Sequence, residues 1–325
     1  MPQPGHKNSI TDVAEVHIGH FTLAEGDLQT GVTAVLPYPL AVRDRKLFIG
    51  AYASGGGHEW TGMHVAQDFG TFSAPIVLCN ATTVGIAYDA LISFGHQREA
   101  DLPIDNAWPP IVIGLDDGYL NDLRERRITH DDVLHTIASA KNQPGGNGNV
   151  GIGRGLCAFA GKGGVGEASR IANVNGADFT IGALVAANGG EPSKPNASAI
   201  ARNANPGFII VLATDAPLLP EQLRRLDEAG MRGLDEFGLI ETSSRQLALA
   251  FSTGNTIDRA FEDSFQIFKA RRFSDDMLAP LFAAAAAAST AALINGLQAA
   301  TTVKGRKGRS AHPVEISSLY RRSIE

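Results

Sequence analysis

The 325-residue chain has few cysteines, a small net charge and no long run of strongly hydrophobic residues. Only Cys79 and Cys157 are present, so no disulfide framework is expected. A formal charge of −6 and a pI near 5.9 argue against a dedicated nucleic-acid surface. The N-terminal stretch "MPQPGHKNSI" lacks the apolar core of a secretion signal, so the expected location is the cytoplasm.

The most apolar stretch covers 278–300, and weakly hydrophobic alanine makes up much of it. Ser289, Thr290 and Asn295 interrupt it, so it predicts a buried helix rather than a membrane span. The one basic run, "KGRKGRS" at 304–310, is expected to be a solvated loop. Neither a membrane nor a nucleic acid is therefore predicted as a partner.

Short β-branched runs alternate with amphipathic stretches along the whole chain, without a domain break or a repeat. Helices are expected at 84–94, 129–140, 220–230 and 276–300, where Thr129 with Asp132 suits an N-cap and Pro220 suits a first turn. This alternation predicts an α/β fold in a single domain, 1–325. Strands are expected at 31–36, 75–80, 109–114, 178–187, 208–214 and 246–253.

The run "AGKGGVGEASR" at 160–170 looks like the phosphate-binding loop of a nucleotide-binding protein. Such a loop needs a Ser or Thr directly after its lysine, to bind Mg²⁺. Here the position after Gly166 is Glu167, which would place a negative charge beside the phosphate. His58, Glu59 and His64 likewise lack the spacing of zinc ligands on one helical face. No metal or cofactor is predicted.

A set of motifs in a fixed order resembles one known family over nearly the whole chain. From about Ile10 to about Arg309, the motifs are similar to the DmpA-type family of L-aminopeptidases/D-amidases, which includes β-aminopeptidases and nylon-oligomer hydrolases. The resemblance implies a four-layer α-β-β-α sandwich, a homo-oligomer and a small amide or amino-acid-like ligand. It also implies that "GKGGVGEASR" is a glycine-rich turn after a strand. The motifs include "GHEWTGMH", "NATTVGIAYDAL", "DDGYLND", "GKGGVGEASR", "FTIGALVAANGG", "IIVLATDAPLLPEQL" and "LAFSTGN".

Members of that family cut their own chain after a linker, and the freed N-terminal Ser or Thr becomes the nucleophile. The segment 189–207 has the composition of such a linker, so by resemblance 1–207 corresponds to the first piece and 208–325 to the second. The attacking hydroxyl must lie one carbon from the scissile nitrogen. Here Gly207 is followed by Phe208, whose ring has no lone pair for an attack. We expect no cleavage between them.

Other positions that the resemblance implies for the site also differ. Ser244 is retained at a catalytic position, but Gln246 replaces the carboxylate that follows it. Gly114 stands where the family has a Glu for the substrate ammonium, and Asp116 replaces a Tyr that supports the oxyanion. Asn188 matches the Asn on the oxyanion side, but an Asn that satisfies backbone groups at a strand end is an equally good interpretation.

Three hypotheses follow from the sequence. The first is a single uncut chain that lacks the standard aminopeptidase mechanism and binds a small amide or amino-acid-like ligand. The second is an active amide or ester hydrolase with a relocated nucleophile, for which Ser244 is the best candidate and Ser198 or Cys157 a weaker one. Asp116 or Asp117 would then supply the missing charge. The third and last is nucleotide binding at 160–170.

Overall fold

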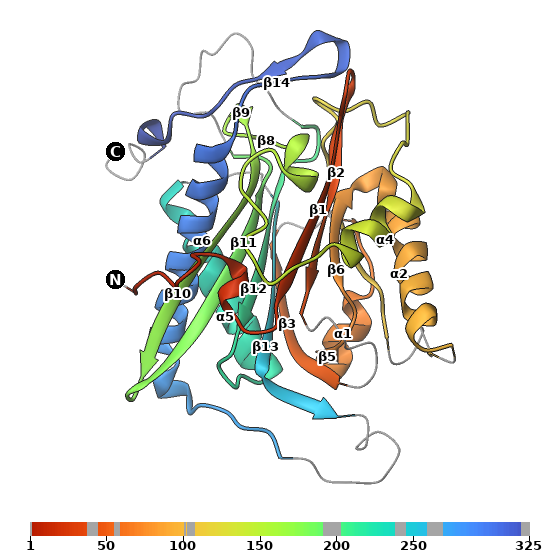
Figure 1. The fold of residues 1–325 in the computed structure, drawn as a ribbon. Coiled ribbons are helices and arrows are strands. Elements are labelled where there is room, and N and C mark those ends of the chain that lie inside the picture. The colour runs from red at the N-terminus through yellow and green to blue at the C-terminus, as the bar shows by residue number, and fades with distance from the viewer. Residues whose placement is uncertain are drawn as a thin grey trace.

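Two β-sheets lie face to face at the centre of the fold, and helices cover the outer face of each sheet (Figure 1). The five-stranded sheet has the order β1-β2-β6-β7-β4, and the six-stranded sheet has the order β10-β11-β12-β13-β3-β5. Two short hairpins, β8-β9 and β14-β15, lie outside these sheets. The structure is a computed structural model that describes residues 2–37, 45–54, 59–100, 102, 108–190, 203–237, 245–258 and 269–319.

The elements follow one another as an alternation of strands and helices. The strands are β1 (His17–Glu25), β2 (Leu28–Leu36), β3 (Arg45–Ser54), β4 (Glu59–Trp60), β5 (Thr71–Phe72), β6 (Ile76–Asn80), β7 (Ile111–Leu115), β8 (Cys157–Ala158), β9 (Gly161–Lys162), β10 (Gly164–Val174), β11 (Ala177–Ala187), β12 (Gly207–Thr214), β13 (Arg245–Asp258), β14 (Val303–Lys304) and β15 (Ser310–Ala311). The α-helices are α1 (Met63–Phe69), α2 (Val84–Arg98), α4 (His130–Ala138), α5 (Pro220–Arg232) and α6 (Ala279–Ala299).

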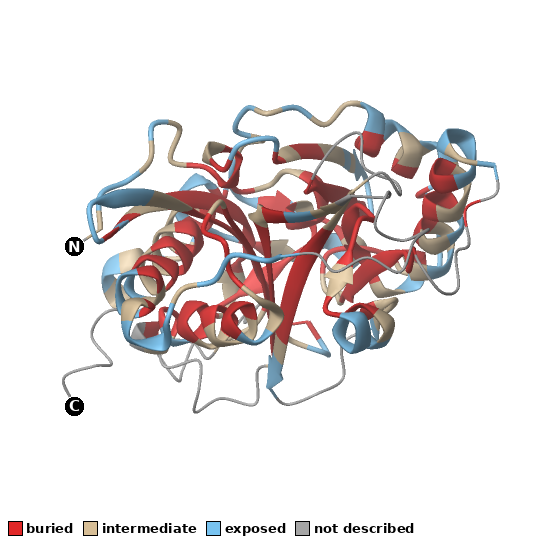
Figure 2. Cartoon of the chain, turned by 90° about the horizontal axis from the view of Figure 1, so that it is seen from below, coloured by how far each residue is buried: buried red, intermediate tan, exposed pale blue. Residues whose placement is uncertain are grey.

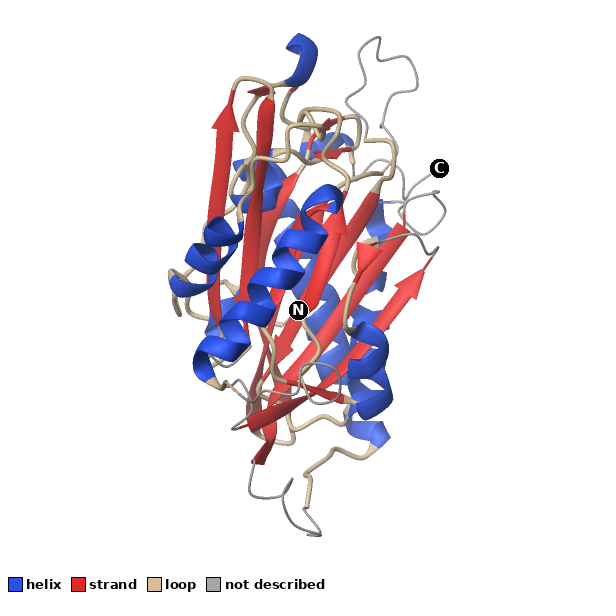
Figure 3. Cartoon of the chain, turned by 90° about the vertical axis from the view of Figure 1, so that its right-hand side faces the viewer, coloured by secondary structure: helices blue, strands red, loops and turns tan. Residues whose placement is uncertain are grey.

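Three apolar clusters separate the layers of the fold. One cluster fills the space between the two sheets, a second lies under α2 and α4, and a third lies under α5 and α6. Buried residues accordingly concentrate in the middle of the molecule and exposed ones on the outer helix faces (Figure 2). Viewed from the side of α2, helices lie in front of the strands and behind them (Figure 3). This arrangement is the expected four-layer α-β-β-α sandwich.

The six expected strands and four expected helices are all present, with small changes in their bounds. Thr129 caps α4 in a capping box with Asp132, and Pro220 opens α5, as expected. Within the described residues, α6 is the one helix long and apolar enough to span a membrane, but it packs on β10 and β11 as a helix of the core. The elements that were not expected are the long strands β1, β3 and β10, helix α1 and the two-residue strands β4, β5, β8, β9, β14 and β15.

The glycine-rich run at 160–170 is mostly strand β10, which corrects the expected turn. A turn covers only the residues around the short hairpin β8-β9, and β10 then runs from Gly164 along β11. Gly166 lies against α6, where a Cβ atom at 166 would come within 1.9 Å of the Ala292 carbonyl oxygen. Gly166 therefore permits a close approach of the strand backbone to the helix backbone.

Lys162 is fully buried and bonded to the backbone around it. Its Nζ atom donates to the carbonyl oxygens of Gly153 at 2.6 Å, Leu156 at 2.9 Å and Gly163 at 2.8 Å. Burial lowers the pKa of Lys162 to about 7, yet three acceptors are the full number that an ammonium group can serve. This geometry is inconsistent with a lysine that reaches a nucleotide phosphate.

Glu167 is also held inside the protein. Ser9 Oγ and the backbone N–H of Gly145 donate to its two carboxylate oxygens, the latter at 2.7 Å. Burial raises the pKa of Glu167. Lys162 and Glu167, the two residues on which the nucleotide hypothesis depends, therefore both have internal partners.

Asp227 of α5 is a carboxyl group in the apolar layer between that helix and the six-stranded sheet. Its side chain is fully buried, and neither carboxyl oxygen makes a hydrogen bond of normal geometry with a described residue. Burial raises the pKa of Asp227 well above its usual value, while the backbone N–H of Ala250 and the charge of Arg224 act in the opposite direction. The folded protein therefore favours a neutral Asp227.

Replacing Asp227 with asparagine is expected to stabilise the protein at pH 7 by about 1–3 kcal/mol. In the unfolded chain the carboxyl group ionises near its usual pKa, whereas in the folded chain the raised pKa keeps it protonated to higher pH, so the wild-type protein loses stability as the pH rises above about 4. Asparagine does not ionise, so the gain should be small at pH 4 and larger at pH 7. Urea unfolding of both proteins at pH 4 and pH 7 measures the gain in unfolding free energy. An equal gain at both pH values would contradict a raised pKa of Asp227 as its cause.

Candidate functional site

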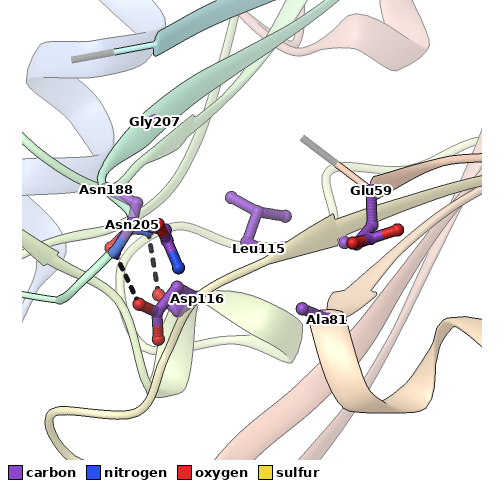
Figure 4. Close-up of a pocket in the computed structure, with 8 residues that line it drawn as sticks. Glu59, Ala81, Leu115, Asp116, Asn188, Asn205 and Gly207 are labelled. Carbon is purple, nitrogen blue, oxygen red and sulfur yellow. Dashed lines mark hydrogen bonds between the residues drawn. The ribbon is translucent and has the colours of Figure 1, made fainter. Parts of the chain in front are cut away.

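A cavity of about 80 Å³ lies where the end of β7 in one sheet approaches the start of β12 in the other (Figure 4). It brings together Gly114, Asp116, Asn188 and Gly207, four of the positions that the sequence assigned to the site. These residues come from three segments far apart in the sequence. The lining residues are Glu59, Ala81, Gly114, Leu115, Asp116, Asn188, Asn205 and Gly207.

Asn188 is the central residue of the hydrogen-bond network at this cavity. Its Nδ2 atom donates to the carbonyl oxygen of Asp116 at 2.9 Å, and its Oδ1 atom accepts from the backbone N–H of Cys157 at 3.3 Å. The side-chain amide of Asn203 also donates to Asn188 Oδ1. Asn188 is buried, so these three bonds fix its orientation. The side chain satisfies backbone groups at a strand end and lines the cavity at the same time.

Asp116 fixes the segment that precedes β12. Its Oδ1 atom accepts from the backbone N–H of Gly118 at 2.8 Å, and its Oδ2 atom accepts from that of Asn205 at 2.7 Å. Asn203 Oδ1 accepts in turn from the backbone N–H of Tyr119 at 2.8 Å. The described end of the linker is therefore tied to the loop after β7 by two independent contacts.

The basic run near the C-terminus is mostly exposed, as expected for a solvated loop, and it also contacts the loop after β7. The backbone N–H of Arg306 donates to the carbonyl oxygen of Leu120 at 2.7 Å. The guanidinium group of Arg306 donates to the carbonyl oxygen of Gly118 at 3.2 Å. The guanidinium group of Arg309 lies 5.0 Å from the centre of the Tyr119 ring. These contacts hold the loop after β7 from its outer side.

Gly207 and Phe208 face opposite sides of the six-stranded sheet. Gly207 lines the cavity, and its backbone N–H donates to the carbonyl oxygen of Asn188. Phe208 is fully buried in the cluster under α5 and α6, with its ring centre 5.9 Å from that of Phe159. Since side chains alternate along a strand, the Phe208 ring points away from the cavity. It does not plug the cavity.

Gln246 shares the orientation of Phe208. The two residues are paired in the parallel register of β12 and β13, and Gln246 has the same strand phase as Ala248 and Ala250, which lie in the cluster under α5 and α6. Gln246 is buried and does not line the cavity. Ser244 and Ser198, the proposed replacement nucleophiles, lie outside the described residues.

Cys157 and Asp117, the remaining candidates, are buried beside the cavity and do not line it. Burial raises the pKa of the Cys157 thiol to about 12, which disfavours the reactive thiolate at neutral pH. Burial also raises the pKa of Asp117 to about 7, although the side-chain amide of Asn121 donates a hydrogen bond to its carboxylate at 3.1 Å. Neither residue is positioned to attack or to bind a ligand in the cavity.

Sequence reasoning did not assign four of the lining residues to the site. Glu59 was considered only as a metal ligand, and Asn205 only as part of a linker. Glu59 lies in the motif "GHEWTGMH" and Asn205 in the linker, but only the pairing of β4 with β7 and the contact of Asn205 with Asp116 place them at the cavity. Within the described ranges, no three His, Cys, Asp or Glu side chains come together as metal ligands. The four missed residues are Glu59, Ala81, Leu115 and Asn205.

Comparison with known proteins gives consistent matches over nearly the whole chain. Residues 8–311 match the family model described as peptidase family S58. A beta-peptidyl aminopeptidase, BapA, from Sphingosinicella microcystinivorans is 32% identical over 343 residues, which cover 94% of this chain and 85% of that protein.

Two solved structures have the same fold. The PH0078 protein from Pyrococcus horikoshii OT3 has a TM-score of 0.89 and 32% identity, with 99% of this chain and 95% of that chain covered. The L-aminopeptidase D-Ala-esterase/amidase from Ochrobactrum anthropi, a serine aminopeptidase with a variant of the Ntn-hydrolase fold, has a TM-score of 0.86 and 28% identity, with 98% and 94% covered. These matches agree with the resemblance in the sequence and with the DmpA-type sandwich.

Proposed function

Because the chain belongs to peptidase family S58, we propose that it keeps the family's cavity as a binding site for a small amide or amino-acid-like ligand but remains one uncut chain without aminopeptidase activity. The observation that carries this proposal is the residue at the start of β12. Gly207 is the backbone position that faces the cavity, and it has no side chain.

Acyl transfer by an N-terminal nucleophile needs a hydroxyl or thiol group beside the scissile peptide and the oxyanion donors. Phe208 cannot supply it, because its ring is apolar and faces the helix layer. Pro206 and Asn205, the preceding residues, have no such group either. None of the eight described residues that line the cavity has a hydroxyl, thiol or amino group. The proposal therefore holds whichever of Gly207 and Phe208 corresponds to the family's nucleophile.

The purified protein is expected to be a single species of 34.2 kDa and to release no amine from aminoacyl amides or aminoacyl p-nitroanilides. Intact mass spectrometry in denaturant and an amide-hydrolysis assay measure the two quantities. A fragment that begins at residue 207 or 208 would contradict the proposal.

Hydrolysis without cleavage of the chain would instead favour the relocated nucleophile. In that case Ser244→Ala is the deciding variant, because it removes the hydroxyl at the retained family position. Activity that is lost in this variant would replace our proposal with the hydrolase hypothesis. Activity that persists would exclude Ser244 as well.

A further inference from the structure

We propose that the cavity recognises the ammonium group of its ligand and that Glu59 is the residue that binds this group. The inference rests on the proposed function, since it assigns a ligand class to the same cavity. It assigns the role to a residue of β4, whereas the position that the resemblance implies for it is Gly114 of β7, which has no side chain.

The charges at the cavity favour a positively charged ligand group. Two of its described lining residues, Glu59 and Asp116, are acidic, and none is basic. The carboxylate of Asp116 already holds two backbone N–H groups. The Glu59 side chain is exposed and makes no hydrogen bond or ion pair with any residue in the described part of the chain. Glu59 is therefore the carboxylate that is available to a ligand.

The backbone of Glu59 is held firmly although β4 is short. Glu59 pairs with Gly114 across β4 and β7. Directly after β4, the hydroxyl of Thr61 donates to the carbonyl oxygen of Pro110 at 2.8 Å and accepts from the backbone N–H of Val112 at 3.0 Å. The backbone N–H of Thr61 also donates to the Val112 carbonyl oxygen at 3.0 Å. These bonds fix the point from which the Glu59 side chain enters the cavity.

The packing around Gly114 explains why the carboxylate comes from position 59. A Cβ atom at 114 would lie 2.9 Å from Glu59 Cβ, 2.8 Å from Val84 Cγ2 and 3.0 Å from Ala81 Cα. No side chain fits at 114 without moving these neighbours. The Cβ atom of Glu59 therefore takes up space that a side chain at position 114, its partner across β4 and β7, would need.

The opposite wall of the cavity has a different chemical character. Asn188 and Asn205 lie across from Glu59, with the Leu115 side chain between the two sides (Figure 4). Amide groups can donate to and accept from an amide of the ligand. An acidic wall, an apolar middle and an amide wall suit a small molecule with an ammonium group and a nearby amide. An amino-acid amide is the simplest compound of this class.

The test compares two probes and three proteins by isothermal titration calorimetry at pH 7. The probes are L-alaninamide, which has an ammonium group, and N-acetyl-L-alaninamide, which does not. The proteins are the wild type, Glu59→Gln and the matched control Glu25→Gln, which changes an exposed carboxylate at the end of β1. Thermal unfolding of all three proteins checks that they are equally folded.

We expect the wild type and Glu25→Gln to bind L-alaninamide equally and Glu59→Gln to bind it at least about fivefold more weakly. The acetylated probe should bind weakly to all three proteins. Equal binding of both probes, or unchanged affinity of Glu59→Gln, would overturn the role of Glu59 and leave the proposed function intact. Failure of the wild type to bind either probe would overturn the proposed function together with this inference.

Discussion

Replacing Phe208 with serine is expected to destabilise the protein by about 3–5 kcal/mol and to leave the chain uncut. The ring is fully buried beside Phe159, so its loss leaves a large cavity and buries an unpaired hydroxyl group. That hydroxyl group would face α5 and α6 and not the lining residues of the ligand cavity. Urea unfolding measures the loss, and intact mass spectrometry detects any fragment.

The matched control for this variant is Gly207→Ser, which puts a hydroxyl group on the opposite side of β12. Gly207 lines the ligand cavity beside Asn188, so the added group should face that cavity without removing any part of the core. Phe208→Ser should therefore be the less stable variant by several kcal/mol. Self-cleavage in Phe208→Ser but not in Gly207→Ser would show that our assignment of the two faces is wrong.

Replacing Gly166 with alanine is expected to cost at least about 3 kcal/mol or to prevent folding. A Cβ atom at 166 would lie 1.9 Å from the carbonyl oxygen of Ala292 and 2.4 Å from the backbone nitrogen of Gly296. Both contacts are with the backbone of α6, which cannot turn aside as a side chain can. The substitution would push α6 away from β10 and open the layer between the helix and the six-stranded sheet.

Gly85→Ala is the control for a glycine that has room for a side chain. Gly85 lies in the first turn of α2, and a Cβ atom there would have no described neighbour within 4 Å. Alanine favours a helix over glycine by up to about 1 kcal/mol, so this variant should be unchanged or slightly more stable. Thermal unfolding of both variants provides the comparison. Equal melting temperatures would contradict the close contact of β10 with α6.

The sequence predicts those elements whose local pattern decides their structure. Fully apolar runs such as 208–214 are strands in the structure, and the Thr129–Asp132 pair caps α4. Strand β10 was missed because Gly166, Glu167 and Ser169 interrupt its apolar pattern. Each of these residues is explained by a contact with a distant segment, since Gly166 meets α6 and Ser169 donates to Asp12 at 2.6 Å. A local pattern contains no information about such partners.

The candidate site could be predicted only in part, because it too depends on contacts between distant segments. The resemblance selected Gly114, Asp116, Asn188 and Gly207, and the structure brings them to one cavity. It could not show which way a side chain at the start of β12 points, because a shift of one residue along a strand reverses the side of the sheet. It also could not identify Glu59, whose place at the cavity depends on the pairing of β4 with β7.

The position of β12 determines which methods can tell a cut chain from an uncut one. β12 lies between β11 and β13, so the linker enters the middle of the six-stranded sheet and not its edge. A nick before Phe208 would leave the two fragments joined by backbone hydrogen bonds between β11 and β12 and between β3 and β13. A nicked molecule and a whole one would then elute together from a gel-filtration column. Only a method that unfolds the protein can tell them apart.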